Sequence, residues 1–87
     1  MFELYRISWD EKARDFLRTL PKEDVKRIVK RLDSILSFPE HYLEVLVQVN
    51  AFKLRVGNYR IIIDLDRTNE LIRVLFVGHR KNVYDAL

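Results

Sequence analysis

The chain has 87 residues, a formal net charge of +3 and no cysteine. A chain of this length can bury one modest core, and 48% of its residues are hydrophobic, so we expect a single folded domain over residues 1–87. The lack of cysteine excludes disulfides and thiolate metal sites, and no apolar run reaches the roughly 18 residues of a membrane-spanning helix. Because the first residues do not read as a signal peptide, we expect a cytoplasmic protein with no membrane partner.

The first half of the chain predicts one strand followed by two helices. The run FELYRI is typical of a strand, and its apolar residues on both faces suggest a central position in a sheet. Ser8 with Glu11 fits a capping box, which predicts a first helix over residues 9–19. Pro21 can open a second helix, which must end before Pro39. The two helices are joined so closely that they should form an antiparallel hairpin.

The second half predicts strands, because from Leu43 onward the apolar residues alternate with a period of two. Gly57 and Asn58 are a two-residue hairpin signal, DRTNE reads as a second turn, and residues 71–77 form the last strand. We therefore expect an α+β fold in the order β-α-α-β-β-β. In it, a helical hairpin packs on one face of a twisted, mostly antiparallel sheet of about four to five strands.

Two arginines are expected to face each other across the first hairpin. A turn at Gly57 and Asn58 sets Arg55 opposite Arg60, with Lys53 two residues away on the same face. Like charges placed opposite each other in a sheet are destabilising by up to about 1 kcal/mol, so a sequence selected only for folding would seldom place them there. These three residues, hereafter the strand cluster, are either ordinary solvated side chains or a phosphate site, for which guanidinium groups have the matching geometry.

The register of the last strand is expected to extend this cluster. A turn centred in DRTNE pairs Asp64 with Arg73, which are complementary charges. The same register sets Arg60 opposite Val77 and places His79 on the cationic face. Three further polar residues follow on the tail: Arg80, Lys81 and Tyr84.

Other chemistries have weaker support in the sequence. The two histidines have no acidic residue at metal-ligand spacing, so no metal site is expected. The serines have no partners resembling a catalytic triad. The second helix carries a basic face, which is interpreted as a solvated surface rather than as a nucleic-acid surface. Its residues are Lys22, Lys26, Arg27, Lys30 and Arg31.

The order of elements, the segment FKLRVGNYRIIIDL and the ending VLFVGHRKNVYD together resemble the RelE branch of the RelE/ParE superfamily of toxin–antitoxin toxins. The resemblance covers essentially the whole chain. The LRVGNYRI hairpin is fairly specific to the superfamily, and GHRKNVY is more typical of the RelE branch. The resemblance implies a RelE-like fold and a toxin that acts as a ribosome-dependent mRNA endonuclease (an mRNA interferase). Such an enzyme needs no cofactor and inhibits translation by cutting mRNA in the decoding site.

The resemblance also implies roles for individual residues. In the implied reaction, the ribose 2′-OH attacks the adjacent phosphorus. Lys53 would be the base, Arg60 would hold the scissile phosphate, and Arg80 would stabilise the transition state. Tyr84 would stack on a base. The expected RNA-binding residues beside these four are Arg55, His79 and Lys81. The strand EVLVQVN departs from the family in carrying no cation.

Two other functions remain open at this point. One is a ParE-like poison of DNA gyrase, which has the same fold and acts by binding. The other is a non-catalytic, degenerate toxin that binds only its antitoxin and operator DNA. The implied partners are a cognate RelB-like antitoxin, the ribosome with its mRNA, and operator DNA reached through the antitoxin.

Overall fold

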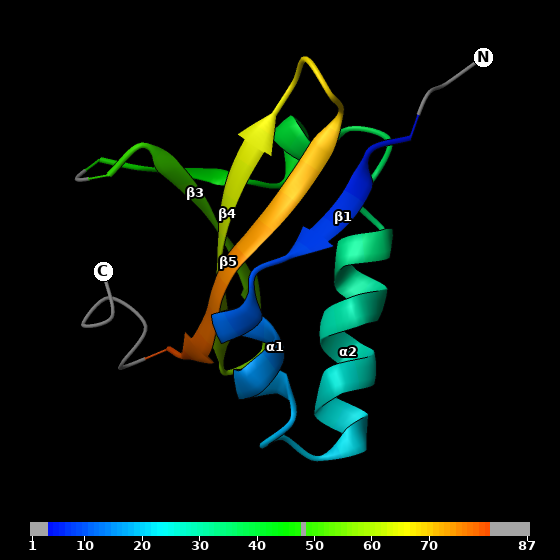
Figure 1. Ribbon diagram of the computed structural model, residues 1–87, viewed down its shortest axis with the longest axis vertical. Coiled ribbons are helices and arrows are strands. Elements are labelled where there is room, and N and C mark those ends of the chain that lie inside the picture. The colour runs from blue at the N-terminus through cyan, green and yellow to red at the C-terminus, as the bar shows by residue number, and fades with distance from the viewer. Residues whose placement is uncertain (1–3, 48, 81–87) are drawn as a thin grey trace.

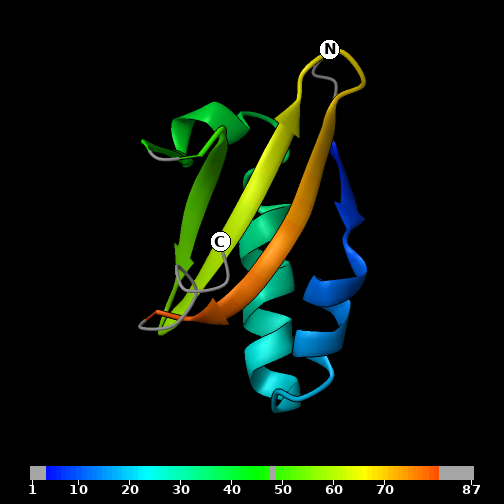
Figure 2. The same ribbon diagram turned by 60° about the vertical axis from the view of Figure 1, so that its left-hand side comes forward.

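The computed structural model describes residues 4–47 and 49–80. Its five strands lie in the order β1-β5-β4-β3-β2, and both helices cover the same face of this twisted sheet (Figures 1 and 2). The elements are β1 (Arg6–Trp9), α1 (Glu11–Leu17), α2 (Lys22–Asp33), a 3₁₀ turn (Pro39–His41), β2 (Glu44–Leu46), β3 (Ala51–Val56), β4 (Tyr59–Asp66) and β5 (Leu71–His79). The predicted α+β fold, with a helical pair on one face of a mostly antiparallel sheet, is confirmed.

The first strand lies at an edge of the sheet, so its predicted central position is wrong. β1 pairs only with β5, in parallel. Its side chains alternate: Arg6 and Ser8 are exposed, whereas Ile7 and Trp9 pack against the core beneath the helices. An edge strand beneath a helix needs one apolar face only. The second apolar face predicted for FELYRI includes Leu4, which is 56% exposed.

The first helix begins later than the capping box predicted. Asp10, not Ser8, is its N-cap, and the Asp10 carboxylate accepts a hydrogen bond of 3.0 Å from the Lys12 N–H. Ser8 belongs to β1, where it pairs with Arg73. An aspartate cap is as good as a serine cap, so strand pairing decides the boundary. Among the described residues, neither helix is long and apolar enough to cross a membrane.

The main core lies between the helices and the sheet. Its fully buried large side chains come from α2, from the loop that follows it and from the three central strands: Ile28, Leu32, Ile35, Leu54, Ile61, Ile63, Ile72 and Val74. Each such side chain contributes about 1.5–3 kcal/mol on burial. A smaller cluster on the helix-free face centres on Ala51 and Ile62. The sheet is thus anchored on both faces, which gives the strands that carry the strand cluster a rigid base.

The hairpin between β3 and β4 has the register predicted from its turn. Val56 pairs with Tyr59 and Arg55 pairs with Arg60. Gly57 has a φ of +57°, and Asn58 has no positive φ, the pattern of a type II′ turn, in which glycine takes the first central position. Any other residue at Gly57 would be strained. This turn therefore fixes which side chains of β3 and β4 share a face.

The segment before β3 forms less strand than its alternation predicted. β2 covers only Glu44–Leu46 and pairs with Ala51–Lys53. The valines that continue the alternation are exposed, Val45 by 69% and Val47 by 97%. Alternation predicts a strand only where one face is buried, and no described residue covers these valines. Among the described residues, the second half of β3 consequently has no strand neighbour on this side.

Candidate nucleic-acid interface

The helix-free face of the β3–β4 hairpin brings the strand cluster together. Arg55 lies directly opposite Arg60, and Lys53 lies opposite Ile62, as the sequence predicted. Leu54 and Ile61 point the other way, into the main core, because successive side chains on a strand alternate between faces. Three cations therefore converge on one small area of the sheet.

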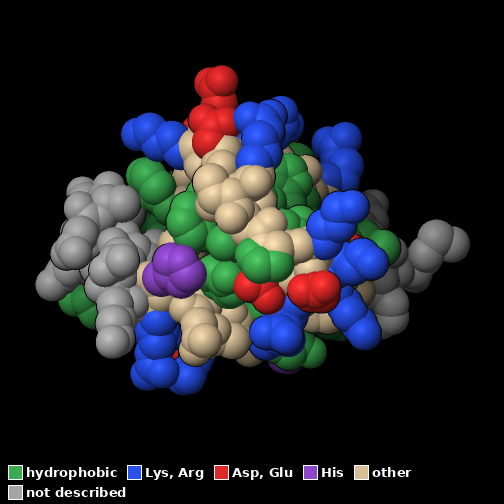
Figure 3. Space-filling view, turned by 90° about the horizontal axis from the view of Figure 1, so that it is seen from below, with side chains coloured by type: hydrophobic (Ala, Val, Ile, Leu, Met, Phe, Trp, Pro, Cys, Tyr) green, Lys and Arg blue, Asp and Glu red, His purple; other side chains and the backbone are tan. Residues whose placement is uncertain are grey.

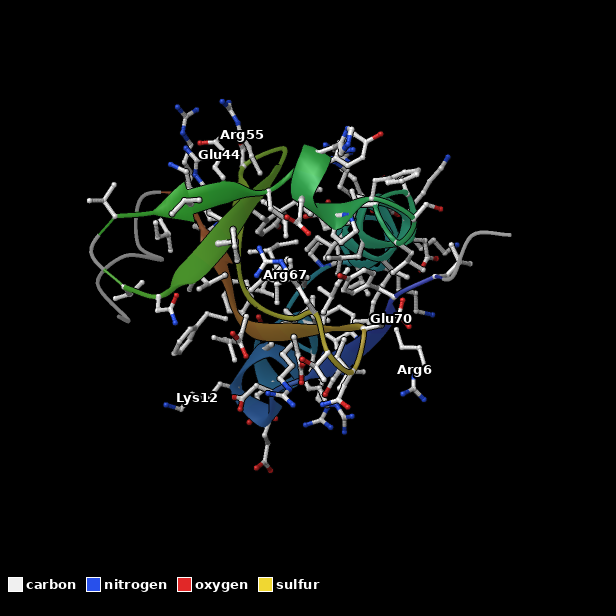
Figure 4. All side chains as sticks on the ribbon, turned by 90° about the horizontal axis from the view of Figure 1, so that it is seen from above. Arg6, Lys12, Glu44, Arg55, Arg67 and Glu70 are labelled. Atoms are coloured by element: carbon white, nitrogen blue, oxygen red, sulfur yellow. The ribbon has the colours of Figure 1, made fainter. Side chains whose placement is uncertain are left out.

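Lys53 has a partner that the sequence did not reveal. Its Nζ lies 3.5 Å from Oε2 of Glu44, which sits directly across from it on β2. Figure 4 shows Glu44 of β2 and Arg55 of β3 extending from the same side of the sheet. The Glu44 side chain is 70% exposed, and such ion pairs stabilise a protein by at most about 1 kcal/mol. Glu44 therefore holds Lys53 on this face, but a polyanion can displace it.

Arg60 is the most unusual member of the strand cluster. It is half-buried, and its Nε–H is buried without a hydrogen-bond acceptor among the described residues. Its strand neighbours are Arg55 on one side and Gly78 on the other, neither of which carries a negative charge. A buried donor without an acceptor is destabilising. A phosphate oxygen would satisfy this N–H and compensate both arginine charges.

The register predicted for β5 is right at one end and wrong at the other. Asp64 pairs with Arg73 as expected, but Arg60 pairs with Gly78 instead of Val77. A bulge is the cause: Ile63 pairs with Val74 and Ile62 with Phe76, which leaves Leu75 as an extra residue. Such a bulge reverses the alternation of every later residue on its strand.

The bulge moves His79 away from the cationic face, which corrects the prediction that it lies there. His79 pairs with Tyr59, whose side chain belongs to the main core. The two rings are tilted, with centroids 5.2 Å apart, and the Phe16 ring meets His79 edge-on at 5.7 Å. His79 thus lies on the helix side, at the rim of an aromatic cluster that ties the end of β5 to α1.

Tyr59 fixes this cluster to α2. Its hydroxyl donates a hydrogen bond of 2.6 Å to Oδ2 of Asp24. This hydrogen bond, followed by burial and the charge of Asp24, raises the pKa of Tyr59. The bond joins the first turn of α2 to the start of β4, the strand that carries Arg60.

We expect Tyr59→Phe to lower the free energy of unfolding by about 1 kcal/mol, the usual net value of a hydrogen bond. A raised pKa in the folded state means that this contribution is complete below the ordinary tyrosine value of 10.0. It is lost as the pH rises above that value. Denaturant unfolding at pH 8 and at about pH 11 should show the difference between wild type and variant narrowing at the higher pH. A constant difference would contradict the assignment.

Arg80, the first residue after β5, lies beside the hairpin turn. The Arg80 N–H donates a hydrogen bond of 2.8 Å to the carbonyl of Asn58, and the Arg80 side chain is exposed. Asn58 is two residues before Arg60 in the chain, so this bond brings the backbone of Arg80 to the same end of the sheet as the strand cluster. Lys81 and Tyr84, the other predicted tail residues, lie outside the described residues.

The opposite end of the helix-free face is electrically balanced. The Arg73 guanidinium lies 3.5 Å from Asp64 and 3.2 Å from Asp66. Asp66 also accepts hydrogen bonds from the side chain and backbone N–H of Asn69, which lower the pKa of its carboxyl. Positive charge therefore predominates towards the β3–β4 turn. That end of the molecule is seen in Figure 3, where Lys and Arg side chains surround much of the surface.

These groups together can bind and polarise a phosphodiester. Guanidinium and ammonium groups are the side chains that recognise phosphate oxygens. Within residues 4–47 and 49–80, no group of three or more His, Asp and Glu side chains is placed to hold a metal ion. The cations of the strand cluster can supply electrostatic stabilisation to a phosphodiester.

A family model identifies the chain as a toxin of the RelE/ParE superfamily. The family model described as the ParE toxin of the type II toxin–antitoxin system parDE matches residues 7–84. The chain therefore belongs to this family of type II toxins, and the resemblance noted in the sequence is confirmed. No curated protein matched the chain in the sequence comparison.

Solved structures of RelE toxins share the fold. The RelBE2 toxin–antitoxin complex of Mycobacterium tuberculosis aligns with a TM-score of 0.82 at 23% identity, covering 90% of this chain and 100% of that chain. The intact Escherichia coli RelBE complex aligns at 0.74 with 22% identity, covering 86% and 95%. The RelB–RelE complex of Methanococcus jannaschii aligns at 0.67 with 25% identity, covering 92% and 98%. The expected RelE-like architecture is thus confirmed.

Proposed function

We propose that this toxin is a ribosome-dependent endoribonuclease that cuts mRNA and so inhibits translation. The observation that carries the proposal is Arg60, whose buried Nε–H finds no acceptor among the described residues and whose cross-strand partner is a second arginine. A bound anion would satisfy this donor and compensate the charges of both arginines. An RNA phosphate is the anion that a toxin acting on translation would meet.

In the proposed reaction the ribose 2′-oxygen attacks the adjacent phosphorus and the bond to the 5′-oxygen breaks. The products are a 2′,3′-cyclic phosphate and a free 5′-hydroxyl. The 2′-hydroxyl proton passes to a base, and the departing 5′-oxygen takes up a proton. Among the strand cluster, Lys53 is the candidate base, because arginine does not give up its proton in proteins. Lys53 can take up this proton only as a neutral amine, so its own proton passes to water before the attack, and the departing 5′-oxygen takes its proton from water.

The other residues stabilise charge and position the RNA. Arg60 holds the scissile phosphate, and Arg80 compensates the charge that develops on it in the transition state. Tyr84 stacks on a base and so holds the mRNA for in-line attack. Three further residues contact RNA around these: Arg55, Lys81 and His79. His79 does so from the helix side of the sheet, where its exposed ring can stack but cannot reach the strand cluster's face.

A second candidate function is inhibition of DNA gyrase, because the family model that matches the chain is that of a ParE toxin. A gyrase poison acts by binding and does not need its cations arranged around a scissile phosphate. The convergence of Arg55 and Arg60 on one spot therefore favours the nuclease. A degenerate toxin that only binds its antitoxin and operator DNA would also cut no mRNA.

The proposed partner is a RelB-like antitoxin. The similar RelE structures from M. tuberculosis, Pyrococcus horikoshii and E. coli are complexes of toxin with antitoxin. Through such an antitoxin the toxin would also reach operator DNA. The ribosome and its mRNA are the proposed targets, which places the protein's action in the cytoplasm.

The function is tested by primer extension on an mRNA that is being translated in vitro, with and without the purified toxin. We expect cuts within the translated region that are absent when the same mRNA is free of ribosomes. A gyrase supercoiling assay is run on the same preparation. Folded toxin that makes no cuts but inhibits supercoiling would overturn the proposal in favour of the second candidate.

A further inference from the structure

A second group of cations lies around the edge of the sheet from the strand cluster, between α2 and the end of β3. The residues there line an open hollow of about 420 Å³: Arg27, Lys30, Arg31, Ser34, Arg55, Val56 and Gly57. Those from the α2 segment recur at intervals of three and four residues, so they form one stripe along the helix. Four of these seven residues are cationic and none is acidic. This group is hereafter the α2 pocket.

The α2 pocket is not neutralised by its surroundings. Among the described residues, none of its four cations lies within 4.0 Å of a carboxylate oxygen. By contrast, Arg18, Arg67 and Arg73 each form such an ion pair elsewhere in the molecule. Unpaired cations gathered around one hollow repel one another. Their arrangement is therefore favourable chiefly when an anion occupies the hollow.

One of these guanidinium groups is held by contacts, and a second lies beside the hairpin turn. The Arg31 guanidinium lies over the Tyr42 ring, 5.1 Å from its centroid, and its Nη1 donates a hydrogen bond of 3.4 Å to Ser34 Oγ. The Arg27 Nη1 lies beside the β3–β4 turn, 3.4 Å from where a Cβ on Gly57 would stand. Side chains that are already ordered lose little entropy when a ligand binds. The α2 pocket is thus partly preorganised.

Arg55 connects this pocket to the strand cluster. It lines the hollow and also pairs with Arg60 across the hairpin. It can serve both because β2 pairs with β3 only over Ala51–Lys53, so no described strand covers the edge of β3 at Arg55. Positive charge therefore runs without interruption from the helix-free face, around this open edge, to α2.

We propose that the α2 pocket binds a second backbone phosphate of RNA and so orients the toxin for cleavage at the strand cluster. This inference rests on the proposed function for its ligand. The residues that line the pocket include four cations and no acid, which is the kind of surface that a phosphate backbone contacts. The phosphate belongs either to the mRNA on either side of the cut or to structured RNA of the ribosome, since both present the same phosphodiester.

The test compares two double variants of α2. Arg27→Gln with Lys30→Gln removes two cations from the pocket, and Lys22→Gln with Lys26→Gln removes two from the same helix outside it. Glutamine has a helix propensity close to that of lysine and arginine, and thermal unfolding confirms that both variants are folded. Binding is measured for a 2′-O-methyl RNA oligonucleotide, which cannot be cut, and for vacant ribosomes, over a range of salt concentrations. Binding to a cognate antitoxin is measured in parallel.

We expect the pocket variant to bind RNA about tenfold more weakly than the control variant, as the loss of a charged hydrogen bond implies. Its plot of log affinity against log salt should be shallower by roughly 0.7 for each phosphate that the variant no longer binds. Weaker binding of the free oligonucleotide assigns the phosphate to mRNA, and weaker binding confined to ribosomes assigns it to ribosomal RNA. Equal RNA binding by both variants overturns the inference, and so does a loss of antitoxin binding alone.

Failure of the proposed nuclease function would give a different result from failure of the proposed phosphate site. Because the RNA cannot be cut, these measurements do not depend on nuclease activity. A wild-type toxin that cuts mRNA while the two variants bind alike would overturn this inference only. A toxin that cuts nothing while its pocket variant loses RNA affinity would overturn the nuclease and uphold the phosphate site.

Discussion

Arg60→Ala is expected to reduce ribosome-dependent cleavage by at least about 100-fold, the usual effect of removing one donor that stabilises developing charge. In the proposed site Arg60 provides the guanidinium closest to the scissile phosphate, and no described residue of opposite charge competes for its Nε–H. The measurement is the rate of cutting by primer extension at saturating ribosome concentration. A loss in rate at saturation, rather than in affinity alone, marks a contact that strengthens in the transition state.

Arg73→Ala is the matched control for this variant. Arg73 also carries one positive charge on β5 next to the helix-free face, but it is paired with Asp64 and Asp66 at the balanced end. The control removes the same net charge, so both variants lose the same long-range attraction to RNA. If cleavage falls equally in the two variants, the effect is one of net charge, and Arg60 has no special place in the site.

The stability of Arg60→Ala gives a second readout. The substitution removes a buried donor that has no described acceptor. It also removes the repulsion between Arg60 and Arg55, and both changes favour the folded state. It also removes the packing of the arginine stem. We expect these effects to leave the free energy of unfolding within about 1 kcal/mol of wild type. A fall of several kcal/mol in the free energy of unfolding would show that Arg60 is a structural residue. Any loss of cleavage would then be due to unfolding of the variant.

The hairpin that carries the strand cluster could be predicted from sequence because its information is local. Gly57 supplies the one positive φ that the turn needs, and the apolar residues on each side of it permit a single register. Arg55 and Arg60 then meet by geometry alone. Glu44 could not be paired with Lys53 in the same way, because nothing in the exposed, valine-rich segment before β3 fixes where pairing begins.

The position of His79 could not be predicted because the bulge at Leu75 has no marker in the sequence. Leu75 and Phe76 are both apolar and both contact the small cluster on the helix-free face, so the strand reads as one apolar run with no break in period. Period counting predicts the register only where the alternation is regular. One extra residue was enough to move both Val77 and His79 from the predicted helix-free face to the helix side of the sheet.

Arg80→Ala is expected to reduce cleavage by about 100-fold or more while leaving the fold unchanged. The Arg80 side chain is exposed, and the hydrogen bond that positions the residue comes from its backbone N–H to Asn58, which alanine retains. Exposed substitutions of this kind alter stability by at most about 0.5 kcal/mol. The rate of cutting is measured as for Arg60, together with thermal unfolding.

Arg80→Lys separates charge from shape at the same position. Lysine keeps the charge but lacks the planar fork that holds two phosphate oxygens at once, so we expect this variant to recover part of the lost rate. The exposed Arg18→Ala, at the C-cap of α1, removes a cation that is paired with Asp15, and this variant should cut like wild type. Wild-type cutting by Arg80→Ala would confine the chemistry to the strand cluster. The tail that begins beside Asn58 would then contribute binding only, because its first cation would have no part in the transition state.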